Sequence, residues 1–318
     1  MKIVILDRKT LGEDIGLEGL NEYGEVITYE TTKENEVEER IKNAHIVITN
    51  KVLLNEENMN RADNLKLICV AATGTNNIDL SYCLKAGIRV CNVAGYSTNS
   101  VTQHTFAMLF YILENMAYYD EYVKSKEYVK SNIFTNLQKP YYEIKGKIWG
   151  IIGLGNIGKN VAEIAKAFGA TIVYYSTSGQ NINDKYVKLD LEELLKVSDI
   201  VSIHAPLNDK TKNLLNYENL KCMKESSILI NVGRGGIVNE EDLIKILNEN
   251  KIRGAALDVL EKEPMRENSP LFKLEDKNKI LITPHIGWAS KEARHTLMEE
   301  IALNIDSFLK GEDRNKVV

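Results

Sequence analysis

Short apolar runs alternate with amphipathic stretches along the first part of the chain. The stretch KENEVEERIKNA (33–44) places its apolar residues at the spacing of a helix. Runs rich in β-branched residues predict strands at 2–6, 25–29, 45–49, 65–71 and 88–93. Strands that alternate with helices in this way predict a parallel sheet covered by helices on both faces.

A different pattern begins near Tyr96. Residues 97–132 predict one long helix or two consecutive helices, opened by a cluster of Ser, Thr and Asn residues that suit a helix N-terminus. The first part of this stretch is apolar nearly all round, which is typical of a helix buried against another surface. Two interpretations stay open on this pattern: a helix in a dimer interface, or a core helix of its own domain.

The alternation of strands and helices resumes after residue 146. The predicted strands are 148–152, 171–175, 199–205, 226–232, 252–259 and 279–284. Six strands in this order match the number in a doubly wound dinucleotide-binding sheet. A last amphipathic helix, 290–311, follows the final strand. It is placed to cross back onto the first domain, which would make that domain discontinuous.

Composition narrows the class of protein. A chain of 318 residues with 44% hydrophobic and 27% charged residues predicts a soluble protein of two domains. Its net charge of −5 gives no electrostatic footprint for nucleic acid or an anionic membrane. No apolar stretch is long enough to cross a bilayer. The four cysteines form no C-x-x-C pair and the five histidines show no ligand spacing, so we expect free thiols in a reducing cytoplasm and no metal.

The stretch GKIWGIIGLGNIGKNVAEIAKAFGATIVYYSTSG (146–179) has the complete strand–turn–helix–strand context of a G-x-G-x-x-G motif. Gly153 permits the tight turn, Gly155 lets a pyrophosphate approach the backbone, and Gly158 allows the helix to pack closely on the strand. The helix N-terminus, with Asn156 and Ile157, offers N–H donors to the anion. A glycine-rich turn that binds nothing is the alternative, and the complete context disfavours it.

The end of the second strand of this motif determines the choice of cofactor. NAD-binding folds usually place an acidic residue there for the ribose hydroxyls, but this chain has Ser176, Thr177 and Ser178. The missing acid removes a charge that would repel a 2′-phosphate, and no arginine replaces it. Hydroxyl groups can hydrogen-bond a ribose or a phosphate. We therefore expect NAD, with NADP as the alternative.

Three later strand ends have residues suited to chemistry, and in a parallel sheet such loops emerge at the edge where ligands bind. Arg234 lies between glycines, Asp258 and Glu263 follow the next strand, and His285 comes directly after Pro284. A histidine can move a proton near neutral pH, and a carboxylate on its other nitrogen fixes the tautomer. A guanidinium can bind a carboxylate substrate in a bidentate manner. One such residue alone would be an ordinary loop residue, but three on successive strand ends predict hydride transfer involving a hydroxy acid.

These residues also lie in segments that resemble the motifs of a known family. The segments GLGNIG, HAPLNDKTKNLL, INVGRGGIVNE, LDVLEKEP and TPHIGWAS resemble, in this order, the motifs of the D-isomer-specific 2-hydroxyacid dehydrogenases, and the resemblance covers nearly the whole chain. It implies two doubly wound α/β domains with the active site in the cleft between them. A flavodoxin-like substrate domain would comprise 1–97 plus 287–318, and a Rossmann NAD-binding domain 98–286.

The resemblance also implies roles for single residues. Arg234 would bind the substrate, Glu263 would orient the histidine, and His285 would be the acid/base. Asp258 would lie by the nicotinamide amide, and Thr211 would close over the nucleotide. Further residues implied to line the nucleotide site are His204, Ala205, Pro206, Val232, Gly233 and Gly287.

Two segments near the N-terminus match the family's substrate loops. In AATGTNNID (71–79), the backbone N–H groups of Thr73 and Gly74 would hold the substrate carboxylate. TNKVLLNEE (49–57) resembles the glycerate dehydrogenase (hydroxypyruvate reductase) branch and would place Lys51 near the cleft, although a solvated lysine is an equal alternative. The phosphoglycerate branch is expected to have arginines here, so the single cation favours an unphosphorylated substrate.

We predict a cytoplasmic NAD(P)-dependent D-2-hydroxyacid dehydrogenase that reduces a small 2-oxo acid such as hydroxypyruvate or glyoxylate. The alternatives within the family are enzymes for D-lactate, D-2-hydroxyisocaproate or phosphoglycerate; formate dehydrogenase is disfavoured, because formate has no hydroxyl to deprotonate. A nucleotide-sensing corepressor of the same fold is the alternative outside enzymes, and the absence of an extension beyond Val318 argues against it. Family members are commonly homodimers joined through the helix after the first hinge, which favours that interpretation of residues 98–117.

Overall fold

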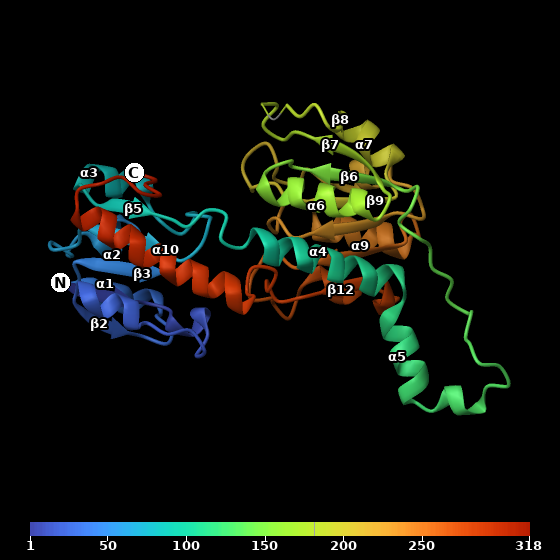
Figure 1. Cartoon of the computed structure of the whole chain (residues 1–318), viewed down its shortest axis with the longest axis horizontal. Coiled ribbons are helices and arrows are strands. Elements are labelled where there is room, and N and C mark those ends of the chain that lie inside the picture. Colours follow the sequence, from blue (N-terminus) through green and yellow to red (C-terminus); the bar gives the residue numbers. More distant parts are fainter. Residues whose placement is uncertain (181) are drawn as a thin grey trace. The chain divides into compact units, whose positions relative to one another are not determined.

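The computed structural model describes residues 1–180 and 182–318 and contains two compact units (Figure 1). Unit 1 combines Met1–Ser97 with Ala289–Val318, and unit 2 is Thr98–Trp288. The chain returns to unit 1 after Trp288, two residues later than the boundary placed from the sequence.

Unit 1 is built on a five-stranded parallel sheet in the order β2-β1-β3-β4-β5, the order of flavodoxin-like sheets. Its strands are β1 Lys2–Ile5, β2 Glu25–Thr28, β3 Ile46–Thr49, β4 Leu67–Val70 and β5 Arg89–Cys91. Its helices and 3-10 turns are η1 Arg8–Leu11, η2 Glu18–Tyr23, η3 Glu34–Glu36, α1 Val37–Ile41, α2 Glu56–Met59, α3 Leu80–Ala86 and α10 Lys291–Leu309. The helix predicted at 33–44 is therefore shorter, a 3-10 turn followed by α1.

The C-terminal segment belongs to unit 1 through its packing. Helix α10 packs against β4 and buries Leu297, Ile301 and Ile305. After the helix, the backbone N–H of Val317 donates to the carbonyl of Val90 at 2.8 Å, which joins the end of the chain to β5. Apolar burial and an added backbone pairing together hold this segment on the sheet.

Unit 2 contains a seven-stranded parallel sheet in the order β12-β11-β10-β9-β6-β7-β8. Its strands are β6 Ile148–Ile152, β7 Thr171–Tyr175, β8 Val187–Lys188, β9 Ile200–Ile203, β10 Ile228–Asn231, β11 Gly254–Leu257 and β12 Ile280–Ile282. Its helices and 3-10 turns are α4 Thr98–Leu113, α5 Met116–Lys124, η4 Glu127–Lys130, α6 Asn156–Ala167, α7 Leu191–Val197, α8 Tyr217–Leu220, α9 Glu240–Asn248, η5 Pro270–Lys273 and η6 Lys277–Lys279.

Both units confirm the predicted fold class of doubly wound parallel α/β sheets. The predicted number of six strands in the second sheet is wrong, because β8 is a seventh. Strand β8 consists of two exposed residues at the sheet edge, and so short a segment produces no hydrophobic periodicity. The strand order around β6 is nevertheless that of a dinucleotide-binding sheet.

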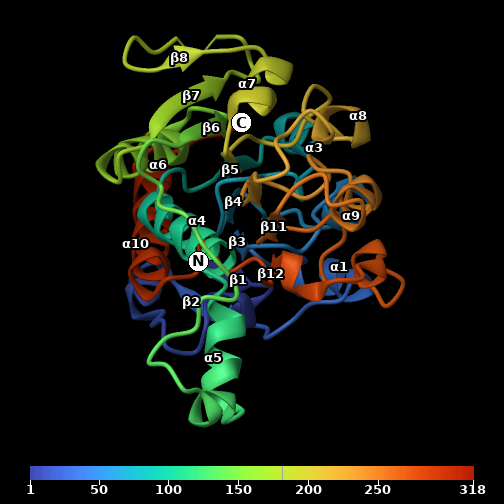
Figure 2. The same ribbon diagram turned by 90° about the vertical axis from the view of Figure 1, so that its right-hand side faces the viewer.

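Helix α4 is a core helix of unit 2. It buries Phe106, Leu109 and Ile112 in one hydrophobic cluster with α6 and with Trp149 of β6. The opposite face of the sheet packs against α7, α8 and α9. The stretch predicted as one long helix or two is two helices, since the left-handed residue Asn115 separates α4 from α5. Helix α5 has no buried side chain and extends away from the sheet of its own unit (Figure 1 and Figure 2).

The cysteines are free thiols within the described residues. Cys69, Cys83 and Cys91 are buried and Cys222 is partly exposed. Burial raises the pKa of the Cys69 thiol well above its usual value, which keeps that thiol protonated and unreactive. In the described part of the chain, no helix combines the length and the apolar character needed to span a membrane.

Candidate active site

The glycine motif forms the turn between β6 and α6. Gly153 has φ +93°, and a Cβ on it would lie 2.9 Å from the backbone nitrogen of Ala205. A Cβ on Gly158 would overlap the carbonyl of Gly153, so this glycine allows α6 to pack against the turn. A Cβ on Gly155 would meet nothing within 4 Å. Gly155 thus borders open space at the N-terminus of α6, where Asn156 and Ile157 begin the helix.

This space is part of a cavity of about 540 Å³ at the carboxyl edge of the sheet. Its lining residues are Gly153, Gly155, Thr177, Ser178, Gln180, His204, Ala205, Pro206, Asn208, Asp209 and Lys210. Ser176 and Thr211 are among the residues predicted for the nucleotide site that do not line this cavity. Ser176 is buried, and Thr211 is buried with its hydroxyl donating to the carbonyl of Pro206 at 2.7 Å. Thr211 therefore shapes the turn that borders the cavity.

His204 supplies a further sign of a ligand at this cavity. Its Nε2 lies 2.9 Å from the hydroxyl of Ser202, which also accepts the indole N–H of Trp149 at 2.8 Å. Its Nδ1 is buried and has no hydrogen-bond partner among the described residues. Burial lowers the pKa of His204 to about 3, so this imidazole is neutral at physiological pH. The unpartnered nitrogen, the open space at Gly155 and the helix N-terminus fit a dinucleotide.

The glycines around Arg234 permit two loops to touch. The Asn231 amide holds the loop after β10, accepting the N–H of Gly233 at 3.1 Å and donating to the carbonyl of Arg234 at 3.0 Å. A Cβ on Gly235 would overlap the carbonyl of Leu260, in the loop that leads to Glu263. Only a residue without a side chain fits there, and this close approach brings the Arg234 loop against the Glu263 loop.

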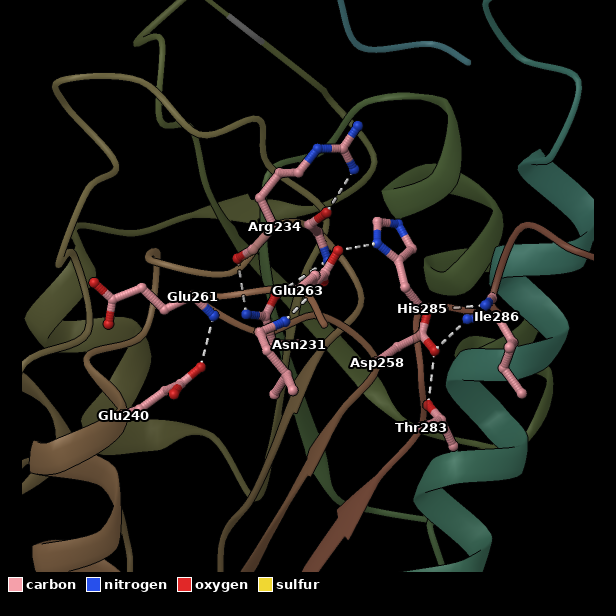
Figure 3. Close-up of polar contacts among 12 residues, drawn as sticks. Asn231, Arg234, Glu240, Asp258, Glu261, Glu263, Thr283, His285 and Ile286 are labelled. Carbon is pink, nitrogen blue, oxygen red and sulfur yellow. Dashed lines mark hydrogen bonds and ion pairs between the residues drawn. The ribbon is translucent and has the colours of Figure 1, made fainter. Parts of the chain in front are cut away.

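Glu263 and His285 form a hydrogen-bonded pair from the ends of two adjacent strands (Figure 3). Nδ1 of His285 lies 2.8 Å from Oε2 of Glu263, and the other carboxylate oxygen accepts the N–H of Leu260 at 2.9 Å. An ionised carboxylate only accepts hydrogen bonds, so the proton of a neutral imidazole lies on Nδ1. The pair leaves Nε2 of His285 to exchange a proton with a substrate.

Asp258 fixes the backbone that presents His285. His285 has φ +55°, a left-handed conformation that residues other than glycine seldom adopt. The backbone N–H of His285 donates to the carbonyl of Asp258 at 2.8 Å. The Asp258 carboxylate accepts the Thr283 hydroxyl at 2.7 Å and the N–H groups of Ile286 and Gly287 at 2.8 Å each. Burial raises the pKa of the Asp258 carboxyl, but these donors and His104 outweigh it, so the pKa lies below its usual value.

His104 is a residue that the sequence analysis missed. Its Nε2 lies 3.1 Å from the Thr283 hydroxyl and 3.3 Å from the carboxylate of Asp258. One turn earlier on α4, the hydroxyl of Ser100 donates to the carbonyl of Gly287 at 2.6 Å. Ser100 and His104 are spaced by four and so share one face of α4, but the first half of this helix has many other polar residues, so the spacing alone did not single them out.

Asp258→Asn is expected to lower the free energy of unfolding by about 2 kcal/mol. Backbone N–H groups donate to both carboxylate oxygens, so either orientation of an asparagine amide turns its NH₂ toward a backbone donor. The folded pKa lies below the unfolded value, so the wild-type advantage is complete above about pH 4 and is lost as the pH falls through the folded pKa. Urea denaturation of both proteins at several pH values measures this. An advantage that grows toward low pH would contradict the arrangement.

The three predicted substrate-loop residues lie at the carboxyl ends of β3 and β4 in unit 1. The N–H of Lys51 donates to the carboxylate of Asp7 at 2.7 Å. The Thr73 hydroxyl donates to the carbonyl of Val93 at 3.0 Å, and Gly74 follows in the same loop. Burial raises the pKa of Asp7 despite the backbone donors that oppose it. Asp7 holds the loop that contains Lys51, a role that the sequence did not reveal.

Residues 106–287 match the family model described as D-isomer specific 2-hydroxyacid dehydrogenase, NAD binding domain. The chain is 36% identical over 317 residues to a glycerate dehydrogenase of Methylorubrum extorquens, covering 99% of this chain and 98% of that protein. It is 38% identical over 325 residues to a hydroxypyruvate reductase of Blautia hydrogenotrophica, covering 100% and 99%. Among solved structures it is similar to D-lactate dehydrogenase from Aquifex aeolicus complexed with NAD and lactic acid, with a TM-score of 0.83, 28% identity and coverage of 98% and 96%.

The strand order, the glycine turn and the histidine–carboxylate pair define a dinucleotide-dependent oxidoreductase. The chain belongs to the D-isomer-specific 2-hydroxyacid dehydrogenase family. The resemblance found in the sequence motifs is thereby confirmed.

Proposed function

We propose that this protein reduces a small 2-oxo acid, hydroxypyruvate or glyoxylate, to the corresponding D-2-hydroxy acid. The observation on which this depends most is the hydrogen bond between Glu263 and His285 beside the Arg234 loop. The names of the relatives, glycerate dehydrogenase and hydroxypyruvate reductase, support the choice of substrate. The single cation at positions 49–51, Lys51, supports an unphosphorylated one.

The three side chains divide the chemistry between them. Arg234 binds the substrate carboxylate through two parallel hydrogen bonds and polarises the neighbouring carbonyl. A bound nicotinamide supplies the hydride for reduction. His285, protonated on both nitrogens at the start, gives the Nε2 proton to the carbonyl oxygen and ends neutral. Glu263 holds Nδ1 and stabilises the imidazolium form until that proton leaves.

Unit 2 supplies the residues that hold the dinucleotide. N–H groups at the start of α6 bind the pyrophosphate, next to the open space at Gly155. The segments 204–206 and 232–233 border the bound dinucleotide. Asp258 lies by its nicotinamide amide, and Gly287 lies beside Asp258. In unit 1, backbone N–H groups of Thr73 and Gly74 and the Lys51 ammonium bind the substrate, which makes unit 1 the substrate domain.

A direct assay tests the proposal. Purified protein is mixed with NADH or NADPH and each of a panel of 2-oxo acids, and the nicotinamide absorbance is followed. We expect turnover to be fastest with hydroxypyruvate or glyoxylate. A preference for pyruvate or a branched 2-oxo acid would place the chain in another branch of the family. Nucleotide binding without turnover of any 2-oxo acid would favour the nucleotide-sensing alternative.

We also propose that the protein is a homodimer joined through the segment that follows α4. Apolar side chains on α5, η4 and the coil after them are exposed within unit 2. They are Met116, Val123, Val129, Ile133, Phe134 and Leu137. Phe134 is 90% exposed and Val129 83%, and so large an apolar surface is typical of an interface between subunits.

The mass in solution checks this prediction. Size-exclusion chromatography with light scattering is expected to give twice the chain mass of 35.9 kDa. The double variant Val129→Asp, Phe134→Asp is expected to shift the mass toward the monomer. A wild-type monomer at micromolar concentration would exclude the proposed dimer.

We place the protein in the cytoplasm, in agreement with its free thiols. The support is that none of the four cysteines forms a disulfide and three of them are buried. The partners that we propose are the small hydroxy or oxo acid, the dinucleotide and a second copy of the chain.

A further inference from the structure

The end of β7 borders the cavity next to the glycine turn. The N–H of Gly153 donates to the carbonyl of Tyr175, the last residue of β7, at 3.0 Å. Thr177 and Ser178 then line the same cavity as Gly153. In a sheet of this order, the ribose of the adenosine half of a dinucleotide lies at this strand end. The residues here therefore discriminate between a ribose with a free 2′-hydroxyl and one with a 2′-phosphate.

This strand end presents hydroxyls and backbone N–H groups, and no carboxylate. The segment after β7 turns tightly, with the N–H of Gly179 donating to the carbonyl of Ser176 at 3.1 Å. The Ser178 hydroxyl accepts the N–H of Gln180 at 3.2 Å, which orients that side chain in the turn. A pair of ribose hydroxyls would be held best by a carboxylate that accepts from both, and residues 176–178 contain none.

Two cations lie near this turn. The Lys188 ammonium donates to the carbonyl of Gly179 at 3.2 Å. Lys210, from the loop after β9, lines the cavity together with Thr177 and Ser178, and it forms no ion pair within residues 1–180 and 182–318. The acidic residue in the lining, Asp209, partly offsets this charge. The sequence could not place Lys210 at the ribose end, because that loop is remote from β7 in the chain.

We propose that this site accepts a 2′-phosphate, so that the protein binds NADPH at least as tightly as NADH. The hydroxyls of Thr177 and Ser178 and the ammonium of Lys210 are the groups that hold the phosphate. A phosphate is doubly charged near neutral pH and accepts several hydrogen bonds, which matches hydroxyl donors combined with a lysine. The inference rests on the proposed function only in that this cavity holds a dinucleotide.

Direct binding measurements test the proposal without turnover. NADH and NADPH are titrated separately into the full chain, and nicotinamide fluorescence gives each Kd. We expect the Kd of NADPH to be equal to or lower than that of NADH. Lys210→Ala is expected to raise the Kd of NADPH about tenfold and to leave that of NADH within about twofold. Asp209→Asn is the matched variant, because it removes a negative charge where Lys210→Ala removes a positive one. It is expected to lower the Kd of NADPH and to leave that of NADH unchanged.

A carboxylate added at the end of β7 tests the same proposal in the opposite direction, by repelling the 2′-phosphate. Ser176→Asp is expected to weaken NADPH by about tenfold or more and to leave NADH binding intact. Because Ser176 is buried, Thr177→Asp on the cavity wall serves as a second variant if the first fails to fold. NADH binding tighter than NADPH in the wild type would overturn the inference and leave the proposed function standing. An equal loss of both nucleotides in Lys210→Ala would overturn it as well, and binding of neither by the wild type would overturn the proposed function itself.

Discussion

His285→Asn is expected to lower kcat for 2-oxo acid reduction by about 10³-fold while the affinity for the dinucleotide stays unchanged. Asparagine has no proton to give to the carbonyl oxygen, so the variant loses general acid catalysis. It is the appropriate replacement because His285 has φ +55°, and asparagine tolerates this left-handed backbone better than most residues. Steady-state kinetics give kcat, and fluorescence titration gives the nucleotide Kd.

Glu263→Gln is the companion variant, which tests the carboxylate that holds His285. The amide keeps the size of the side chain and an oxygen that can accept the N–H of Leu260, but it removes the charge that stabilises the imidazolium. We expect a smaller loss of kcat, about tenfold or somewhat more. Near-normal turnover in His285→Asn would exclude this residue as the acid. A loss of nucleotide binding in parallel with turnover would indicate a distorted loop.

The sequence predicted the fold class well because the strands are buried on both faces. Strands β3, β9 and β10 consist of buried residues throughout, and such runs stand out in any hydropathy pattern. Strand β8 was missed because its two exposed residues pair only with β7 at the edge of the sheet. The role of α4 stayed open because the apolar second half of this helix does not show in its sequence what covers it.

The residues of the candidate site also divide into those that the sequence could predict and those that it could not. The glycine motif, Arg234, Glu263 and His285 were predictable, because each follows a strand and the carboxyl ends of parallel strands share one edge. His104 was not, since its partner Thr283 lies 179 positions further along the chain. The contact of Asp7 with the Lys51 loop also spans two different strand ends. Such partners become visible only when the packing of the elements is known.

Arg234→Lys is expected to lower kcat/KM by about 10²-fold or more and to leave nucleotide binding intact. The arginine guanidinium is planar and makes two parallel hydrogen bonds to a carboxylate, whereas the lysine ammonium is a point charge on a shorter side chain. One charge-assisted hydrogen bond is lost, and the substrate is no longer fixed in orientation. The glycine flanks of the loop are unchanged, so its backbone contacts with Asn231 are expected to persist.

Four measurements separate substrate binding by Arg234 from a structural role: steady-state kinetics, the dinucleotide Kd, the urea midpoint and the binding of an unreactive analogue. KM for the 2-oxo acid is expected to rise and kcat to fall, while the Kd of the dinucleotide and the urea midpoint stay at wild-type values. A carboxylate analogue that cannot be reduced is expected to bind the nucleotide complex of the wild type and not that of the variant. Arg61→Lys, which changes an exposed arginine paired with Glu38, is expected to leave every value unchanged. If Arg234→Lys retained the analogue and most of its turnover, the substrate carboxylate would have to be held elsewhere, because a lysine cannot reproduce the two parallel bonds.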